Sequence, residues 1–516
     1  MTTMEIGLHV IEHADGRLKE MCLREGIPLL KNYSDSPVTL AEDVNHDKAD
    51  ELAKYVREGG IVLCNRRDAA FILKKRIPFL SGATIFHADY SNQHKRIWPF
   101  RVQTSFQPQY IETTPIGDGQ VISFPFHISK NLSDLSYRRM IYPSPVGYPI
   151  ELAPGVGKGE IRRLIVNYIQ VAFLQKGLPF IRLRHGPGSA PNWYAFRVDV
   201  DGGHPYELRK IWEIAQASNL SISFYIHVEP NLREISLLRE MADQGQDIQL
   251  HCYDHHTYLD PALDFENMNR GANILREAGF NITGVVAPYG LWNFELSKIF
   301  EKVGLTYSSE FCFSINDLPS YPKKERETNA VLQIPIEPLC LGMLLKSGLP
   351  EEVLGFIFTW CAKQHQKIAE PIFMYGHPGQ NRMDGHPTIF SNLFREFEIA
   401  GYRKINLTEY AHWWRQREKT ELKVLWNGSH VQIKVKKPAP EQFVEFFLPD
   451  GTIRISEAHD SKVDVATLPT LVDETGHLEH GNVGKWLPIF YTDIKTRKNH
   501  IIKKIKRTIK LHNFLI

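Results

Sequence analysis

The stretch Tyr194–Gly203 reads YAFRVDVDGG, an apolar run that ends in two aspartates and two glycines. Its first part, Tyr194–Val200, predicts a buried β-strand, and the carboxylates stand where that strand ends. Two later stretches have the same form, LHCYDHH at residues 250–256 and MYGHPG at residues 374–379. Chemistry gathers at the carboxyl ends of parallel strands, so the three stretches together predict a parallel sheet or barrel with a site at one end.

Strands and helices alternate over residues 193–417, around these three stretches. Helices are predicted at Glu207–Ala217, Leu232–Gln244 and Phe265–Ala278. The remaining strands are predicted at Ile222–His227, Asp247–Leu250, Gly284–Ala287, Thr306–Ser308, Leu332–Ile336 and Pro371–Tyr375. This alternation is typical of a parallel sheet or barrel with peripheral helices, and we assign residues 193–417 to one such domain.

Residues 1–185 predict a separate N-terminal α/β domain. A strand is expected at Glu5–Val10, and a helix at Asp47–Val56 leads through two glycines into the buried strand Ile61–Cys64. The arrangement resembles the amidotransferase-like domains often fused to glycan enzymes. Cys64 stands in LCNRR and not in the Gly-x-Cys-x-Gly turn of a nucleophile elbow, so we interpret it as a buried core thiol.

The segments around the central domain differ in character. A helix is expected from about Glu160 to Gln175, and HGPGSAPN at residues 185–192 is turn-rich and indicates a linker. After Arg417 the pattern changes to short alternating strands with an Asn-Gly turn at residues 427–428. Residues 418–494 therefore predict a small β-rich domain.

Composition restricts the class of protein. The chain has 516 residues, of which 43% are hydrophobic and 23% charged, and this fits a folded protein of several domains. A net charge of only +2 argues against a nucleic-acid partner for the whole chain. The six cysteines form no CxxC pair, and neither a secretory signal peptide nor an apolar run of transmembrane length is visible. We therefore expect a cytoplasmic protein.

The last segment, residues 495–516, carries eight lysines and arginines and no acidic residue, which leaves the rest of the chain at −6. Its isoleucines recur at helical spacing at residues 502, 505 and 509. A basic amphipathic helix of this kind suits an anionic membrane surface, which would make the protein peripheral on the inner face of the membrane. A helix packed on its own domain and a flexible solubilising tail are, together, equally good interpretations.

His251 and His255 are spaced as two ligands of one metal would be. If the segment turns helically, both imidazoles face one point, and a carboxylate from another strand end completes a His-His-Asp set. Such a set leaves a divalent ion with net positive charge, which lowers the pKa of a bound water. A lone HxxxH pair, or an aspartate at a strand end, is more often structural. Three polar strand ends in one array favour a metal site.

These motifs together resemble the polysaccharide deacetylase family, whose fold is a distorted (β/α) barrel. The resemblance spans Phe196–Trp414, roughly 220 of the 516 residues. It rests on VDVDGG at 198–203, FYI at 224–226, GQDIQLH at 245–251, Pro288-Tyr289-Gly290 and His377. The combination of VDVD with HxxxHH is similar to deformylases of lipid-linked formamido-arabinose, which also have an Asp between the two histidines, here Asp254.

The resemblance implies a role for each matching residue. A divalent metal, zinc by default, would be held by Asp201, His251 and His255. Asp199 would be the general base that takes a proton from the metal-activated water, which attacks the amide carbon. The Pro288–Gly290 turn, through the N–H near Tyr289, would help the metal stabilise the oxyanion, and His377 would protonate the leaving amine.

Two departures from the family pattern affect this assignment. The family commonly has an arginine that orients the base where this chain has Val286, and the first motif is Asp-x-Asp where the family has adjacent aspartates. Which of Asp199 and Asp201 is the base therefore stays open. Glu310 is a candidate for the missing contact to the base, and a surface loop acid is an equally good interpretation of it. Asp254 and His256 are expected around the ligands or facing the substrate.

The function that fits these observations is removal of an acetyl or formyl group from an N-acylated amino sugar, free or lipid-linked, in surface glycan or lipopolysaccharide biosynthesis. One alternative is a hydrolase of a non-sugar amide or ester with the same metal site. The other is a catalytically inactive glycan-binding scaffold, which the Val286 departure keeps open.

Overall fold

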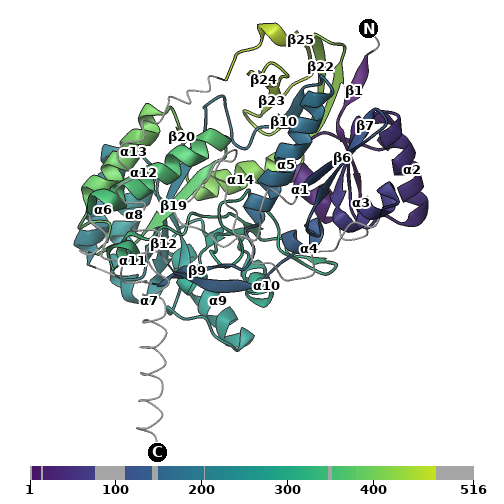
Figure 1. The fold of residues 1–516 in the computed structure, drawn as a ribbon. Helices are drawn as coiled ribbons and strands as arrows, with labels where there is room; N and C mark the ends of the chain where they lie inside the picture. Colours follow the sequence, from purple (N-terminus) through teal and green to yellow (C-terminus); the bar gives the residue numbers. More distant parts are fainter. Residues whose placement is uncertain are drawn as a thin grey trace, which may run out of the picture.

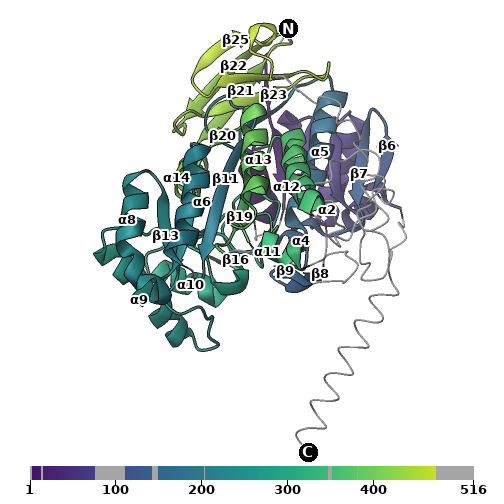
Figure 2. The same ribbon diagram turned by 90° about the vertical axis from the view of Figure 1, so that its left-hand side faces the viewer.

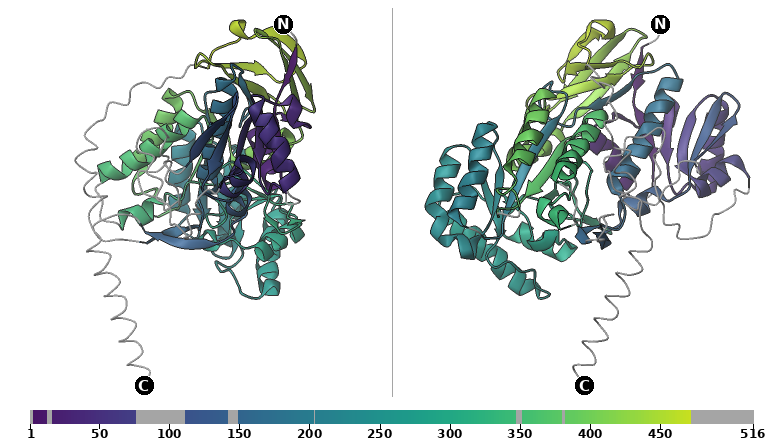
Figure 3. Two further views of the ribbon diagram at one scale, coloured as in Figure 1. Left: turned by 45° about the vertical axis from the view of Figure 1, so that its right-hand side comes forward. Right: turned by 60° about the vertical axis from the view of Figure 1, so that its left-hand side comes forward.

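The computed structural model describes residues 3–12, 16–75, 111–141, 149–202, 204–346, 351–379 and 382–471. A curled parallel sheet with helices around it forms the centre, an α/β unit lies on one side, and antiparallel strands lie over both (Figures 1 and 3). The predicted class, an α/β protein with a distorted (β/α) barrel, an N-terminal α/β part and a C-terminal β part, is confirmed.

The central sheet has the order β18-β15-β14-β13-β12-β11-β19, and every pair in it is parallel. One hydrogen bond, from the Glu337 N–H to the Phe373 carbonyl at 2.9 Å, links the chain after β18 to β19. The strands are β11 (Trp193–Val200), β12 (Ser223–His227), β13 (Asp247–Cys252), β14 (Gly284–Val285), β15 (Tyr307–Ser308), β18 (Leu332–Gln333) and β19 (Ile372–Gly376), and β20 (Arg403–Lys404) also pairs with β11.

Helices cover the outside of this sheet (Figure 2). The longer ones are α6 (Pro205–Ala217), α8 (Ile235–Asp243), α9 (Pro261–Glu277), α10 (Phe294–Lys302), α12 (Glu351–Ile368) and α13 (Pro387–Ile399). The shorter elements of this region are α7 (Val228–Asn231), η3 (Leu232–Glu234), η4 (Pro288–Gly290), α11 (Leu341–Leu345) and the hairpin β16 (Lys323–Lys324) with β17 (Glu327–Thr328).

Side chains alternate along β11 between two apolar cores. Phe196, Val198 and Val200 pack toward the outer helices, whereas Trp193 and Ala195 lie in a second cluster inside the curled sheet. Tyr410 and Trp414 of α14 (Leu407–Arg417) belong to the same inner cluster. Because successive strand residues point to opposite faces, this register sends residues 197 and 199 to the inside.

The N-terminal unit is a doubly wound sheet of order β3-β2-β4-β5-β7-β6, parallel except for β6. Its strands are β2 (Leu8–Ile11), β3 (Leu29–Leu30), β4 (Val38–Ala41), β5 (Ile61–Asn65), β6 (Glu112–Ile116) and β7 (Gly119–Phe124). Its helices are α1 (Arg17–Glu25), η1 (Tyr33–Asp35), α2 (His46–Arg57), α3 (Arg66–Leu73), α4 (Ile128–Leu132) and α5 (Lys158–Gln175), and the hairpin β8 (Tyr137–Ile141) with β9 (Pro149–Pro154) lies between the last two.

The expected single strand Glu5–Val10 is wrong. The chain forms β1 (Met4–Ile6) and β2, which belong to different sheets and are separated at Gly7. A Cβ atom at Gly7 would lie 2.8 Å from the Pro28 carbonyl, so only glycine fits where the chain crosses from one sheet to the other. Alternating apolar residues continue through this crossing, which is why the sequence pattern reads as one strand.

Cys64 lies buried on β5, and the interpretation of it as a core thiol is confirmed. Burial raises the pKa of this thiol well above its usual value, and the nearby Asp68 and Glu42 carboxylates add to the effect. A nucleophilic cysteine requires the opposite shift.

Two antiparallel sheets at the C-terminal side include strands from the first part of the chain. One has the order β1-β21-β22-β25 and the other the order β10-β23-β24. Their bounds are β10 (Phe180–Leu183), β21 (Glu421–Trp426), β22 (His430–Lys436), β23 (Phe443–Phe447), β24 (Ile453–Glu457) and β25 (Ser461–Asp464), followed by η5 (Val465–Thr467). Their buried side chains share one core with α5 and the N-terminal sheet, so the two ends of the chain fold together.

The segment at residues 185–192, expected as a linker, is mostly buried. The Trp193 indole N–H donates to the Pro187 carbonyl at 2.7 Å, and an Arg184 N–H donates to the Gly188 carbonyl at 3.1 Å. The turn-rich composition was read correctly as irregular backbone, but the segment is packed between units and is not an exposed spacer.

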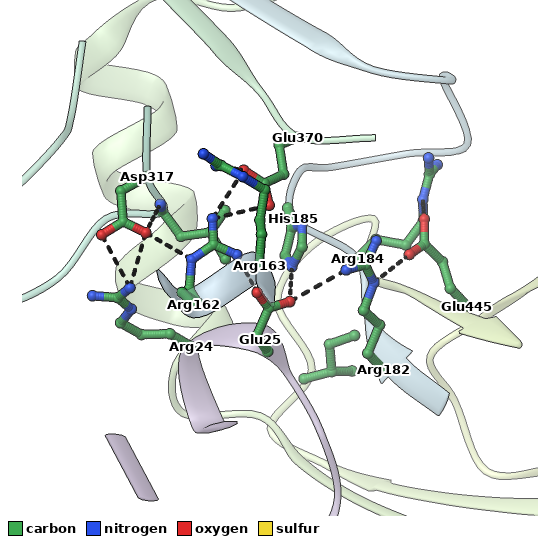
Figure 4. Close-up of polar contacts among 12 residues, drawn as sticks. Arg24, Glu25, Arg162, Arg163, Arg182, Arg184, His185, Asp317, Glu370 and Glu445 are labelled. Atoms are coloured by element: carbon green, nitrogen blue, oxygen red, sulfur yellow. Dashed lines mark hydrogen bonds and ion pairs between the residues drawn. The ribbon is translucent and has the colours of Figure 1, made fainter. Parts of the chain in front are cut away.

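A buried ionic cluster joins these units (Figure 4). The Arg162 guanidinium of α5 bonds Glu25 of α1, Asp317 at 2.6 Å and Glu370 at 2.9 Å. A second set continues from Glu25: Arg182 lies 3.2 Å from it and His185 3.2 Å, while Arg182 and Arg184 each donate to Glu445 of β23 at 2.8 Å. The cluster thus ties the N-terminal unit, the barrel and the C-terminal sheet together.

The predicted basic tail, residues 495–516, lies outside the described residues. Within the described ranges, none of the helices has the length and apolar character needed to cross a bilayer.

Candidate metal centre and its catalytic groups

Asp201, His251 and His255 converge at the carboxyl end of the central sheet. The Asp201 Oδ1 atom lies 3.4 Å from His251 Nε2 and 3.3 Å from His255 Nε2. One ligand-type atom of each residue lies within 4.8 Å of those of the other two. Asp201 follows the last residue of β11, and His251 lies in β13, two strands away in the same parallel sheet.

The loop after β13 presents His255 without forming a helix. Residues 253–255 form a bend that is held by Asn267 of α9, a residue that the sequence did not single out. The Asn267 Oδ1 atom accepts from the N–H groups of Tyr253 at 3.0 Å and Asp254 at 2.7 Å, and its Nδ2 donates to the carbonyls of Asp254 and His256 at 2.9 Å. The expected helical turn is therefore wrong, although the two imidazoles still come together, with ring centroids 4.9 Å apart.

The three side chains fit a divalent metal in charge and in orientation. The His251 Nδ1 bonds the Val286 carbonyl, which requires a proton on Nδ1, so Nε2 is the nitrogen that faces Asp201 and would bind a metal when it carries no proton. Burial opposes ionisation of Asp201, yet its hydrogen bonds to His251 and His255 hold its pKa far below the usual range. Burial likewise opposes charging of His251, but Asp201 outweighs it and raises the pKa of His251. Two imidazoles and one carboxylate around a point of this kind are a common donor set for zinc and similar ions.

Asp199 lies behind this group and is 4% exposed. Its Oδ2 accepts from Arg197 at 3.0 Å, and its Oδ1 is buried and has no hydrogen-bond partner among the described residues. An unpartnered carboxylate oxygen next to a metal-type group is what a general base for an attacking water needs.

Arg197 is a residue of the candidate site that the sequence analysis missed. It is fully buried inside the curled sheet, where it donates to the Ser309 carbonyl. Its guanidinium carbon lies 5.8, 5.1 and 5.3 Å from the ring centroids of Tyr225, Phe311 and Tyr375. The signal was available, because Arg197 stands two residues before Asp199 on one strand and must share its face.

Glu310 is 1% exposed, which excludes the interpretation of it as a surface loop acid. Its Oε1 accepts from the Ala287 N–H at 2.6 Å and from the Ser308 hydroxyl at 2.8 Å, so its contacts hold the chain beside Val286 and do not include Asp199. Burial raises the pKa of Glu310 to about 7, with Arg197 opposing that rise. The sequence analysis looked for a side chain that orients Asp199 at position 286 or at Glu310. In the structure, Arg197 makes this contact.

His377 also lies close to Asp201. Its Nε2 is 3.8 Å from the Asp201 Oδ2, its Nδ1 is 3.7 Å from the Cys340 sulfur, and its ring meets that of Tyr375 edge-on. Burial lowers the pKa of this imidazole. Arg382, a second residue that the sequence analysis missed, reaches the same Asp201 oxygen at 3.4 Å from a partly exposed position.

The Pro288–Gly290 turn borders the site at His255. Tyr289 has a φ of 62° and is 59% exposed, and its ring lies 5.0 Å from that of His255. A Cβ atom at Gly290 would lie 1.8 Å from the Phe311 ring, so glycine is required there. The turn therefore places an exposed aromatic ring at the mouth of the site.

Asp254 and His256, predicted to stand around the ligands, lie on the exposed side of the loop. The His256 ring packs on Tyr258 at 4.6 Å and does not join the Asp201 group. Asp254 accepts from the Tyr258 hydroxyl at 2.6 Å and lies near His227 and Glu229.

Comparison with known proteins finds similar folds but no sequence relative. No protein-family model matches the chain, and no curated protein matches it. Among solved structures, the chain is similar to a protein described as a polysaccharide deacetylase from Pseudomonas aeruginosa PAO1, at 16% identity over 45% of this chain and 94% of that one, with a TM-score of 0.38.

Two further solved structures cover a similar share of the chain. It is similar to the Puue allantoinase at 17% identity over 44% of this chain and 91% of the other, with a TM-score of 0.36. It is also similar to a family 4 carbohydrate esterase from Streptomyces lividans at 13% identity over 42% and 92%, with a TM-score of 0.31. At these TM-scores the likenesses carry no inference about chemistry.

Proposed function

We propose that this protein is a metal-dependent amide hydrolase that removes an acetyl or formyl group from the nitrogen of an amino sugar. The observation that carries the proposal is that the Asp201–His251–His255 group stands together with a buried, arginine-bound Asp199 and with His377. A purely structural metal site does not require a nearby buried carboxylate oxygen without a partner, nor an additional imidazole.

A divalent cation held by Asp201, His251 and His255 would polarise the amide carbonyl and make a bound water easier to deprotonate. Asp199 then takes a proton from the attacking water through its unpartnered Oδ1, while Arg197 keeps the carboxylate oriented. Water adds to the amide carbon, the C–N bond breaks, and the products are a carboxylic acid and a free amine.

We assign to His377 the delivery of a proton to the leaving nitrogen, because its Nε2 lies 3.8 Å from the Asp201 Oδ2 and so borders the place where the amide would bind. We assign to the N–H near Tyr289 the stabilisation of the oxygen that becomes negative during attack, and to the exposed Tyr289 ring a flat surface for a sugar. Deprotonation of Asp199 and reprotonation of His377 return the site to its starting state with one water consumed.

We further propose that the protein acts in the cytoplasm, peripherally on the inner face of the membrane, on a sugar that is free or lipid-linked and destined for surface glycan or lipopolysaccharide. The support is the charge of residues 495–516, with eight basic residues against a more acidic body. Zinc is the proposed ion, in keeping with the nitrogen and oxygen donors.

The test is release of acetate and formate from N-acetyl and N-formyl amino sugars by the purified protein, free and lipid-linked, with metal content measured in parallel. Wild type is expected to release acid, Asp199→Asn to retain metal but lose roughly 10²-fold or more in kcat, and His251→Ala to lose metal and activity. His412→Ala, an exposed histidine on α14, is the matched control and should behave as wild type.

Equal release from simple amides or esters would favour the non-sugar hydrolase. Sugar binding without any acid release by the metal-loaded protein would contradict the enzyme proposal and favour the inactive scaffold.

A further inference from the structure

A second group of metal-type side chains lies beside the first. It consists of His227 at the end of β12, Glu229 in α7 and Asp254 in the loop after β13, and one ligand-type atom of each lies within 4.8 Å of the others. None of the three has a role in the hydrolysis described above.

His227 supplies the observation that points to a ligand. The residue is 8% exposed, and its Nδ1 bonds the main-chain carbonyl of Asp201. A carbonyl can only accept, so Nδ1 carries the proton and Nε2 presents a lone pair. That Nε2 atom is buried and has no hydrogen-bond partner within the ranges that the structure describes. A buried acceptor without a partner is unfavourable, and a bound cation would satisfy it.

The two carboxylates provide the charge that a cation needs. Glu229 and Asp254 are exposed, and their oxygens come close to each other and to the His227 ring. The Tyr258 hydroxyl donates to Asp254 Oδ2 at 2.6 Å, and the Glu229 N–H donates to the Tyr253 carbonyl at 3.1 Å, so both residues are fixed to the same loop. One neutral imidazole with two carboxylates carries a charge of −2, which matches a divalent ion.

The second group of side chains is in direct contact with the Asp201 group. The His227 and His255 rings have centroids 5.4 Å apart, and the bond from His227 to Asp201 links the groups directly. The Asn267 side chain holds the loop that carries both His255 and Asp254. A change in one group therefore reaches the other through a few bonds.

We propose that His227, Glu229 and Asp254 form a second divalent-cation site, which makes the mouth of the barrel a centre for two cations. The second ion stands on the solvent side, where it neutralises the two exposed carboxylates. It also keeps open coordination positions for a substrate oxygen. Binding of this ion does not depend on the reaction proposed above.

The test is a count of bound ions on the full-length protein. The chain is stripped with a chelator, loaded with Zn²⁺ or Mn²⁺, separated from free ion, and analysed for metal per chain, with calorimetric titration in parallel. Wild type is expected to hold two ions, and the double variant Glu229→Gln/Asp254→Asn one. Asp201→Asn should also hold one, with the affinity of the remaining ion changed because the sites are linked.

The matched control is Glu266→Gln/Glu277→Gln, which removes the same charge from exposed positions of α9 and should hold two ions. Thermal unfolding and circular dichroism verify that each variant is folded. If wild type holds one ion or none, or if the Glu229→Gln/Asp254→Asn variant holds as many ions as wild type, the second site does not exist. Two ions without any hydrolysis would uphold this inference while contradicting the proposed function.

Discussion

Arg197 and Asp199 form an enclosed pair in which the cation serves the carboxylate. The guanidinium is surrounded by three aromatic rings, reaches no solvent, and is held by the Ser309 carbonyl as well as by Asp199. Removing a charged group from water costs free energy, so a buried guanidinium is retained only where partners compensate for the lost hydration. Since the Asp199 Oδ1 atom has no hydrogen-bond partner among the described residues, the pair fixes the carboxylate through Oδ2 and leaves the other oxygen available.

Replacing Arg197 by methionine is expected to lower kcat by about 10- to 100-fold while KM changes little, because the guanidinium orients the base and touches no substrate. Steady-state kinetics on an N-acetyl amino sugar measure both constants. Arg197→Lys retains the charge and should recover part of the lost kcat. An unchanged kcat in the methionine variant, with the protein folded, would refute the positioning role.

The candidate site was largely predictable one residue at a time, since every residue of the Asp201 group, Asp199 and His377 stands out by type and by place at a strand end. Arg197 was not predicted because an arginine inside an apolar strand reads as a chance polar residue until its neighbours are known. His227 and Arg382 escaped for a related reason. Their partners come from other strands and loops, and no local pattern brings them together.

The loop after β13 depends on an element that lies outside it. Four hydrogen bonds from the Asn267 side chain on α9 replace the helical turn that the HxxxH spacing suggested. A helix that packs beside the sheet thus helps to position His255 relative to Asp201 and His251.

Asn267→Ala is expected to weaken metal affinity by about 10- to 100-fold, as the loss of a residue that orients metal ligands does. It should also lower stability by about 1 kcal/mol, since four partly buried hydrogen bonds are lost and water can replace some of them. Calorimetric metal titration and urea unfolding measure the two effects. Glu266→Gln, one residue away on the exposed side of α9, is the control, and wild-type metal affinity in the alanine variant would show that the clamp is dispensable.

The elements of the barrel matched their predictions because each buried strand is an apolar run between helices with a clear periodicity. The flanking parts were harder, since β1 pairs with β21 and β10 with β23 across most of the chain. A local pattern marks a strand but does not name its partner. The prediction of a single strand at Glu5–Val10 was wrong for this reason, because the two halves of that apolar segment belong to two different sheets.

The whole molecule is held by the ionic cluster around Arg162 as well as by the shared apolar core. The cluster connects α1, α5, β10 and β23 with the barrel residues Asp317 and Glu370. Its members are almost completely buried, so a charged side chain that loses its partner cannot be hydrated instead.

Arg162→Met is expected to destabilise the folded chain by about 3–5 kcal/mol, because it leaves three carboxylates buried without their shared cation. Urea unfolding monitored by tryptophan fluorescence measures the loss. Lys48→Met, which breaks an exposed pair with Glu51, should cost less than about 1 kcal/mol. Comparable losses in the two variants would mean that the cluster contributes no more than a surface pair.

Stability should also depend on acidity through this cluster. Burial opposes the ionisation of Glu445, but Arg182 and Arg184 outweigh it and lower its pKa from 4.5 to about 2. The pKa values of Glu25, Asp317 and Glu370 are lowered as well. Arg162 is the main charge that opposes burial for Glu25 and Glu370, and Arg24 is the main one for Asp317. A lowered folded-state pKa gives stability above the unfolded value, so this stability should be lost between about pH 4.5 and 2.

Urea unfolding of wild type and Glu445→Gln at several pH values tests this dependence. The difference between the two should be largest at neutral pH and should shrink as the pH falls through that window. A difference that stays constant down to pH 2 would contradict the assignment of the acid-sensitive stability to this carboxylate.

The pairing of Met4–Ile6 with Val424–Trp426 has a consequence for how the chain is made. The first strand leaves the ribosome long before its partner, which is synthesised about 420 residues later. During that interval the edges of β1 and β10 lack the strands that pair with them in the folded chain, and unpaired strand edges attract chaperones and other nascent chains. A message truncated before β21 should therefore yield a product that aggregates.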